Sequence, residues 1–208
     1  PKGQSFLPPG QRASHPSGPA ARESRQRSGP QILADFIAGH ERLRNVLGTL
    51  RDEDWDKPCF HRRGVRPVKD YLGIQLQELA LHGWDIRWGL DRGAELWPGS
   101  LAVLVDLVPR WIDIAFAPDL DLPTPVRYRF DVPSPITIRK DVLVHRDTYK
   151  IETSNTEDAD ATFRCNTGNY ILLMFGRLQV ERGIADGRLS IEGSIERAKN
   201  FNTWFKGF

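Results

Sequence analysis

Apolar residues recur at helical spacing in the first part of the chain and alternate with polar residues in the second part. The helical spacing, about 100° per residue, predicts helices over residues 31–50, 68–90 and 101–116. Pro109 falls inside the third helix and predicts a kink there, because proline lacks the amide hydrogen that a helix uses. The middle helix is apolar on more than one side, which predicts that it is largely buried.

The alternating pattern begins with VRYRFDV at residues 126–132, which is typical of a half-buried strand. Strands gathered after a set of helices, with further helices among them, predict an α+β fold class. Further strands are predicted at 136–138, 142–144, 148–152, 161–165 and 188–192, and further helices at 168–175 and 194–205.

Changes of composition divide the chain into three predicted parts. Residues 1–30 are rich in Pro, Gly and Ser and carry five basic residues against one acidic residue. They predict a flexible basic leader. The proline-rich stretch 118–125 marks a boundary, so we expect a helical domain at 31–117 and an α+β domain at 118–208.

The whole chain has 208 residues, of which 39% are hydrophobic, and is long enough to bury a core. No apolar run reaches the roughly eighteen residues of a membrane helix, and no secretory segment is present. We therefore expect a soluble, cytoplasmic protein without membrane contact. The positive charge is concentrated in the leader, which argues against nucleic acid as a partner. Cys59 and Cys165 lack C-x-x-C spacing and are expected to be free thiols.

The densest set of potential ligands lies in the predicted helix over residues 68–90. Glu78 and His82 are four residues apart and project from one side of it, in a polar stripe that also holds Asp85. A carboxylate and an imidazole can bind a divalent metal; the same spacing also suits a solvated pair worth a few tenths of a kcal/mol. The adjoining apolar face, which we expect to be buried, consists of Leu72, Leu76, Leu79, Gly83 and Ile86.

Three other features have a structural and a functional interpretation. His40 falls in the apolar stripe of the helix over 31–50, where histidine is usually a hydrogen-bonded core residue and less often a ligand. Trp84 and Trp88 fit a core or an interface better than a substrate platform. Residues 61–66, HRRGVR, predict a solvated connecting loop.

Two regions resemble known families. QELALHGWDIRWGL, at residues 77–90, and LADFIAGHERLRNVLGTLRDEDWDKP, at residues 33–58, resemble bundle helices of the mycothiol-dependent maleylpyruvate isomerase family, a branch of the DinB-like bundles. Residues 159–208, with the turn and strand GRLSIEG, resemble the sterol-carrier-protein-like domain that is often fused to such bundles. The resemblance implies a partial DinB-like helical bundle followed by a sterol-carrier-like α+β domain.

The family resemblance implies a divalent metal, usually zinc, bound by Glu78 and His82, with mycothiol as the thiol cofactor. A metal-bound thiol is deprotonated, and such a thiolate can add to an activated double bond and isomerise it, or can capture an electrophile. The family's third ligand is a histidine on an earlier bundle helix that this sequence does not match. His40 is a weak substitute, and Asp85 is a candidate ligand or partner of His82.

Three functions therefore stand as hypotheses. The first is a thiol-dependent isomerase or S-transferase acting on a small molecule. The second is a non-catalytic carrier that binds a hydrophobic ligand in its sterol-carrier-like domain. The third is a structural role, and a homodimer that completes the bundle is the partner hypothesis. The family's catalytic arginine is not assigned by alignment; Arg177, Arg182, Arg188 and Arg197 compete for it, and each can equally be an exposed arginine.

Overall fold

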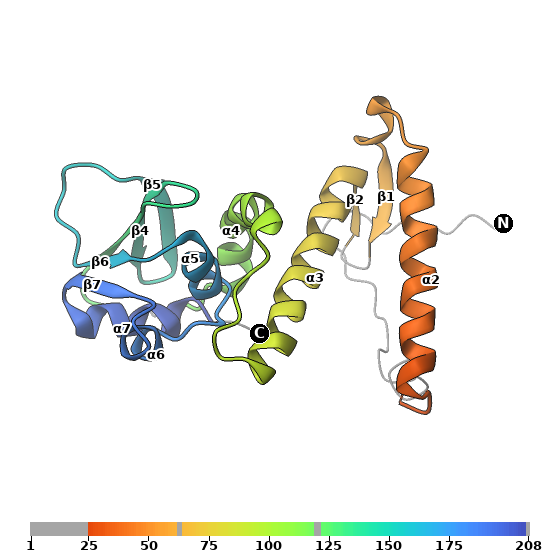
Figure 1. Cartoon of the computed structure of the whole chain (residues 1–208). Helices are drawn as coiled ribbons and strands as arrows, with labels where there is room; N and C mark the ends of the chain where they lie inside the picture. Colours follow the sequence, from red (N-terminus) through yellow and green to blue (C-terminus); the bar gives the residue numbers. More distant parts are fainter. Residues whose placement is uncertain (1–24, 62–63, 119–121, 207–208) are drawn as a thin grey trace. The chain divides into compact units, whose positions relative to one another are not determined.

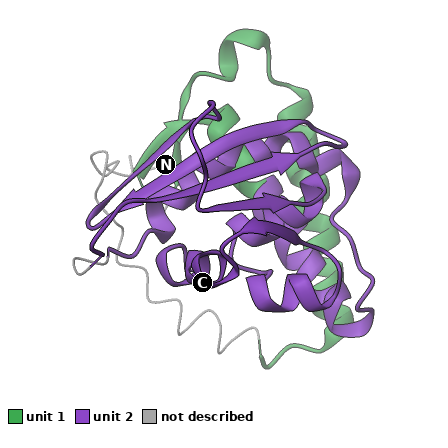
Figure 2. Ribbon diagram, turned by 90° about the vertical axis from the view of Figure 1, so that its left-hand side faces the viewer, with its two compact units in different colours: residues 1–75 green, residues 76–208 purple. Residues whose placement is uncertain are grey.

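A computed structural model describes residues 25–61, 64–118 and 122–206. It divides into two compact units, residues 1–75 and 76–208, which Figure 2 distinguishes by colour. Most of the predicted leader, residues 1–24, lies outside the described residues. Among the described helices, none is long and apolar enough to cross a membrane.

The first unit is built from one long helix, a hairpin and the start of a second helix (Figure 1). Ser28 caps α2 by accepting from the Gln31 amide, and the Gln31 side chain accepts from the Ser28 amide in return. The elements are α2 (Gly29–Gly48), η1 (Asp52–Asp54), β1 (Pro58–His61), β2 (Gly64–Pro67) and the first turns of α3 (Val68–Leu90).

The expectation of a solvated loop at residues 61–66 was wrong for the residues that the structure describes there, because His61 belongs to β1 and residues 64–66 belong to β2; residues 62–63 lie outside the described residues. Phe60 lies opposite Val65 in the antiparallel register, so the segment has a strand partner. Gly64 has a φ of 112°, a conformation that side chains rarely adopt. The polar composition of the segment concealed the pairing.

Helix α2 has the apolar stripe that the sequence predicted, but none of its residues is buried. His40 is exposed and its ring stacks on Phe36 at 6.3 Å between centroids, so its interpretation as a core histidine was wrong. The described residues of this unit contribute nothing to the hydrophobic core. The exposed large apolar side chains of α2 are Ile32, Leu33, Phe36, Ile37 and Val46.

The second unit contains a five-stranded mixed sheet with the strand order β5-β4-β3-β6-β7. The central strand β3 (Val126–Val132) is antiparallel to β4 and parallel to β6. The other elements are η2 (Pro98–Ser100), α4 (Leu101–Ala115), β4 (Ile138–His145), β5 (Thr148–Thr153), β6 (Ala161–Arg164), α5 (Thr167–Met174), α6 (Val180–Ala185), β7 (Ser190–Gly193) and α7 (Ile195–Trp204). Helices followed by this α+β domain confirm the predicted fold class.

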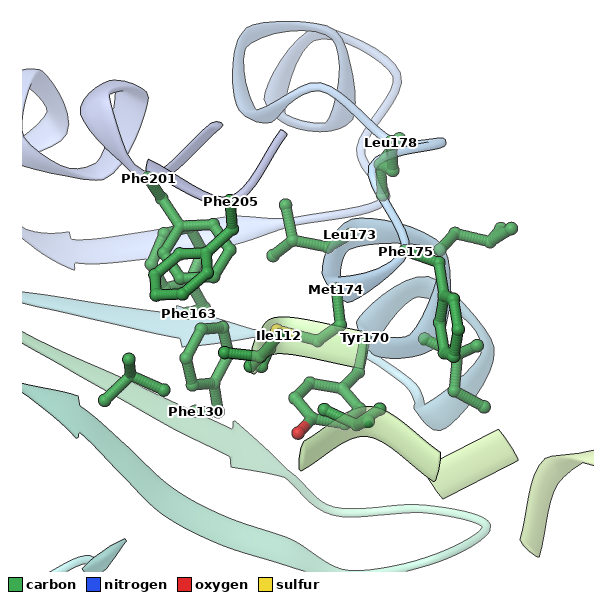
Figure 3. Packing of buried hydrophobic residues seen from close by; sticks show 14 of the residues in the cluster. Ile112, Phe130, Phe163, Tyr170, Leu173, Met174, Phe175, Leu178, Phe201 and Phe205 are labelled. Atoms are coloured by element: carbon green, nitrogen blue, oxygen red, sulfur yellow. The ribbon is translucent and has the colours of Figure 1, made fainter. Parts of the chain in front are cut away.

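One face of β3 forms the centre of the hydrophobic core. Val126, Tyr128, Phe130 and Val132 are fully or almost fully buried. The Phe130 ring stacks on Phe163 of β6 at 5.0 Å, and Figure 3 shows these rings next to side chains from the surrounding helices. Rings on α7 close this core: Phe201 lies 5.4 Å from Phe130 and 5.6 Å from Phe163, and aromatic packing therefore occupies the space between the sheet and α7.

The opposite face of the same strand carries a buried ionic cluster. Asp141 is fully buried and accepts from the Arg127 and Arg129 guanidinium groups, at 3.1 and 2.8 Å, and from the Ser154 hydroxyl at 2.6 Å. Burial by itself would raise the pKa of Asp141, but the hydrogen bonds from Arg129, Ser154 and Arg127 outweigh it and lower the pKa. This carboxylate is therefore ionised in the folded protein.

Asp141→Asn is expected to lower the free energy of unfolding at neutral pH by about 3–5 kcal/mol, because the mostly buried Arg129 loses its carboxylate partner, whereas Arg127 keeps Glu152 and Glu157. A lowered folded-state pKa gives stability that is complete above the ordinary value of 3.8 and is lost as pH falls through the folded-state pKa. Urea unfolding from neutral to acid pH should therefore show a steeper loss of stability in the wild type than in the variant. Glu157→Gln, which removes an exposed partner of Arg127, should cost under about 1 kcal/mol. An equal loss of unfolding free energy in Asp141→Asn and Glu157→Gln would contradict the role of Asp141 as the central anion of the cluster.

Candidate functional site

Glu78 and His82 lie next to each other on α3, as their spacing predicted. Glu78 Oε2 is 3.2 Å from His82 Nε2, and both side chains are solvent-exposed, at 46% and 62%. The Asp85 carboxylate lies 3.0 Å from the other ring nitrogen, Nδ1. One helix face therefore places an acid at each nitrogen of one imidazole, which fixes the orientation of the ring.

Arg177 continues this chain of polar groups from another part of the fold. Its Nη2 lies 3.4 Å from the Asp85 carboxylate, and its Nη1 donates to the Phe175 carbonyl at 2.9 Å. The side chain is only 13% exposed, so its interpretation as an exposed arginine was wrong. The sequence could not find this contact, because 92 positions separate Arg177 from Asp85.

The donor atoms at Glu78 and His82 correspond to part of a zinc site. Two ligand atoms on one tetrahedral zinc, each at roughly 2.0–2.2 Å, lie roughly 3.3–3.5 Å apart, close to the separation seen here. A catalytic zinc has three protein ligands, however, and no group of three or more His, Cys, Asp or Glu side chains in the described part of the chain could hold a metal ion. These residues do not fit a complete site, and His40, in the other unit, stays a prediction as the third ligand.

The face of α3 that is buried differs from the one we expected. Leu79 and Ile86 are exposed, whereas Leu81 and Trp84 are buried in the core. The Trp84 indole N–H donates to the Ala94 carbonyl at 2.9 Å, and its ring stacks on Trp88 at 5.0 Å. This contact holds the segment after α3 against the helix.

The turn between α6 and β7 positions a cation beside Trp88. Gly187 has a φ of 69°, and the amides of Arg188 and Leu189 both donate to the Gly183 carbonyl, at 2.8 and 3.0 Å. A glycine at this position is typical of a helix terminus in which the last residue is left-handed. The turn brings the Arg188 guanidinium to 4.8 Å from the centre of the Trp88 ring.

Arg188 and its neighbours line a space of about 370 Å³, which we call the cationic cleft. The Arg92 and Arg182 guanidinium groups lie 5.4 and 6.0 Å from the Trp88 ring centre. The positive charge exceeds the negative charge, since three arginines face two acids. These charged lining residues are Arg92, Arg182, Arg188, Glu95 and Asp186.

Arg188 is only partly satisfied in this cleft. Its Nε donates to the side-chain oxygen Oδ1 of Asn169 at 2.9 Å, while its Nη1 is buried without a hydrogen-bond partner. Asn169, itself buried, returns a hydrogen bond to the Arg188 carbonyl at 3.1 Å. Burial lowers the pKa of Arg188, partly offset by the nearby charges of Asp186 and Glu95.

A second space of about 310 Å³ shares Glu95, Asn169 and Arg188 with the cationic cleft; we call it the apolar cavity. Thr167 fixes one wall, because its hydroxyl oxygen bonds both the amide and the carbonyl of Ile136 at 3.0 Å. Most of the remaining lining is apolar and comes from the segment around η2, from the connection between β3 and β4, and from α5. It includes Leu96, Pro98, Leu101, Pro135 and Leu172.

The cysteines do not offer a nucleophile. Both are free thiols, as the sequence predicted. Burial raises the pKa of Cys165 to about 12, and burial also raises the pKa of Cys59. The thiolate, which is the reactive form, is therefore scarce at neutral pH for either residue.

Trp84→Phe is expected to lower the free energy of unfolding by about 1–3 kcal/mol, because the Ala94 carbonyl loses its donor while most of the ring remains. The exposed Trp97 gives a matched control: Trp97→Phe should change stability by less than about 0.5 kcal/mol. Urea unfolding of both variants measures the difference. The same small change in both would show that the indole hydrogen bond does not hold the segment after α3.

Comparison with known proteins assigns the two ends of the chain separately. The structure defines a helical segment followed by an α+β domain, and sequence families match each part. Residues 5–87 match the mycothiol maleylpyruvate isomerase N-terminal domain, and residues 126–206 match the SCP-2 sterol transfer family. The two parts of the chain therefore match the models of these two families, as the sequence resemblance predicted. A search of curated proteins gave no match.

Solved structures similar to this chain include sterol carrier proteins. UbiJ-SCP2, a ubiquinone synthesis protein, is 18% identical with a TM-score of 0.39 and covers 51% of this chain and 95% of its own. Sterol carrier protein 2 like 2 from Aedes aegypti is 15% identical, with a TM-score of 0.37 and coverages of 49% and 97%. Sterol carrier protein 2 from Yarrowia lipolytica is 11% identical, with a TM-score of 0.30 and coverages of 53% and 82%.

Proposed function

We propose that this protein binds a small hydrophobic molecule and that the ligand occupies the apolar cavity. The observation that carries the proposal is the lining of that cavity, in which Leu96, Leu101 and Leu172 face the space together with two prolines. Its volume of about 310 Å³ lies at the lower end of the range of small-molecule sites. The match of residues 126–206 to the SCP-2 sterol transfer family supports a carrier function.

Binding is a better match to this geometry than catalysis. The residues nearest the cavity include neither histidine nor cysteine, and its polar lining consists of Glu95, Asn166, Asn169 and Arg188. Such groups can orient a ligand by hydrogen bonds and charge without a nucleophile or a general base. The aromatic packing between the sheet and α7 leaves the apolar cavity as the candidate ligand space.

A cavity-filling substitution tests the proposal. Gly168 lines the cavity on the first turn of α5, and an added Cβ would have its nearest neighbour, Asn166 Oδ1, at 3.5 Å. Gly168→Leu is expected to fold with equal or greater stability and to weaken binding of the neutral dye phenylnaphthylamine by about tenfold or more, because leucine occupies ligand space.

The control is Gly89→Leu, on α3, where an added Cβ meets nothing within 4 Å and which does not line the cavity. Fluorescence titration should give saturable dye binding to the wild type and unchanged binding to this control. Absence of saturable binding to the wild type, or equal affinity in all three proteins, would refute the proposal.

A second candidate function is the metal- and thiol-dependent chemistry of the maleylpyruvate isomerase family. It is favoured by the contact between Glu78 and His82, which has ligand-like geometry, and by Asp85, which holds the second ring nitrogen as a partner of a metal-bound histidine does. The zinc, the mycothiol and the enzymatic activity are all proposals for this chain.

Metal analysis of the purified protein tests this second function. If Glu78 and His82 bind zinc together with a further ligand, the wild type should retain stoichiometric zinc after dialysis, and Glu78→Ala and His82→Ala should each lose most of it. His145→Ala, at an exposed histidine of β4, serves as the control and should keep the metal. Sub-stoichiometric zinc that is the same in all variants would eliminate the site.

A further inference from the structure

Neither family match covers residues 88–125, and this segment builds one side of both spaces described above. Trp88, Arg92 and Glu95 come from this segment, and so do Leu96 and Leu101 of the apolar cavity. The opposite side, with Asn169 and Arg188, belongs to the SCP-2 family part. Both spaces are therefore lined partly by the segment between the two family matches and partly by the SCP-2 family part.

Arg188, Asn169 and Glu95 line both spaces, so a ligand that extends past these side chains would contact both. The apolar cavity has a mostly apolar lining, whereas the cationic cleft presents guanidinium groups around the Trp88 indole ring. A guanidinium in a poorly hydrated position has a large electrostatic cost unless an anion accompanies it. Glu95 and Asp186 line the cleft, but no ion pair joins either of them to Arg188 among the described contacts.

Arg182 does not reduce the unpaired positive charge at Arg188. Its Nε pairs with Asp186 at 3.1 Å, so the direct ion pair of Asp186 is with Arg182, and Asp186 acts on Arg188 only through its nearby charge. The donors that remain for a ligand are Nη2 of Arg188, which makes no hydrogen bond among the described contacts, and the exposed Arg92; Nη1 of Arg188 is buried without an acceptor. A planar guanidinium favours a carboxylate or a similar oxyanion, which can accept two hydrogen bonds at once.

We propose that the ligand is an amphipathic organic anion whose carboxylate or sulfonate pairs with Arg188 in the cationic cleft while its apolar body fills the apolar cavity. Trp88 forms the floor under the guanidinium and holds it by a cation–π contact. Asn169 holds Arg188 at the border of the two spaces through its paired hydrogen bonds. This inference rests on the proposed function, since it specifies the chemical class of the ligand in the same cavity.

Two dyes that differ by one anionic group test the proposal on the full chain. Anilinonaphthalene sulfonate carries a sulfonate, and phenylnaphthylamine has the same aromatic skeleton without it. Arg188→Gln should weaken binding of the sulfonate by about tenfold or more, the usual size of a charge-assisted hydrogen bond, and leave binding of the neutral dye within about twofold. Arg139→Gln, at a mostly exposed arginine of β4 that lines neither space, should change neither.

The outcomes separate this inference from the proposed function. If neither dye binds the wild type saturably, the proposed function fails. If both bind and Arg188→Gln weakens neither, or weakens both equally in a folded protein, the anion site is wrong and the hydrophobic carrier stands. Thermal unfolding shows whether Arg188→Gln folds; if it does not, Arg92→Gln decides. That exposed variant should selectively weaken the sulfonate by about threefold, and an unchanged sulfonate affinity would overturn the proposal.

Discussion

The alternation of side chains along β3 is the constraint on which the second unit depends. Its apolar positions enter the aromatic core, while Arg127, Arg129 and Asp131 face the other side of the sheet. A shift of one residue in register would bury the arginines among the rings and expose the rings instead. Asp141 reinforces the correct register, because it satisfies both arginines only from its position opposite Arg129 on β4.

The ligand site follows from this core. Helix α5 is almost entirely buried against it, and Asn169 on that helix is hydrogen-bonded to Arg188 in the turn before β7. Trp84 anchors the opposite side through the Ala94 carbonyl. Both sides of the two spaces are thus attached to rigid elements, which favours a preformed site over one that must fold around its ligand.

Local patterns predicted the elements well and the site only in part. Helix α3 and strand β3 lie where periodicity placed them, and the pairing of Glu78 with His82 follows from their spacing within one helix. The short helix α6 and the β1–β2 hairpin were missed, because a few residues of mixed polarity carry no clear period. The two matched elements and the Glu78–His82 pair depend on local order alone.

The cationic cleft could not be predicted in this way, since Trp88, Asn169 and Arg188 come together only through the tertiary fold. The sequence did carry a signal: two tryptophans one helical turn apart, and a cluster of arginines near the C-terminal end. Spacing gives no means of joining them across about a hundred positions. The same limit applies to Arg177, whose contact with Asp85 converts an unassigned arginine into a neighbour of the predicted ligand pair.

Burial is unequal in the two units, because the hydrophobic core belongs to the second unit and α2 of the first unit has no buried residue. Helix α2 exposes large apolar side chains such as Leu33 and Phe36, so the contacts within its own unit give it little of the stabilisation that a helix receives from packing. A bundle helix buries such side chains against neighbouring helices. The apolar face of α2 is therefore the surface that the predicted homodimer would cover, and both this homodimer and a third ligand for Glu78 and His82 stay predictions.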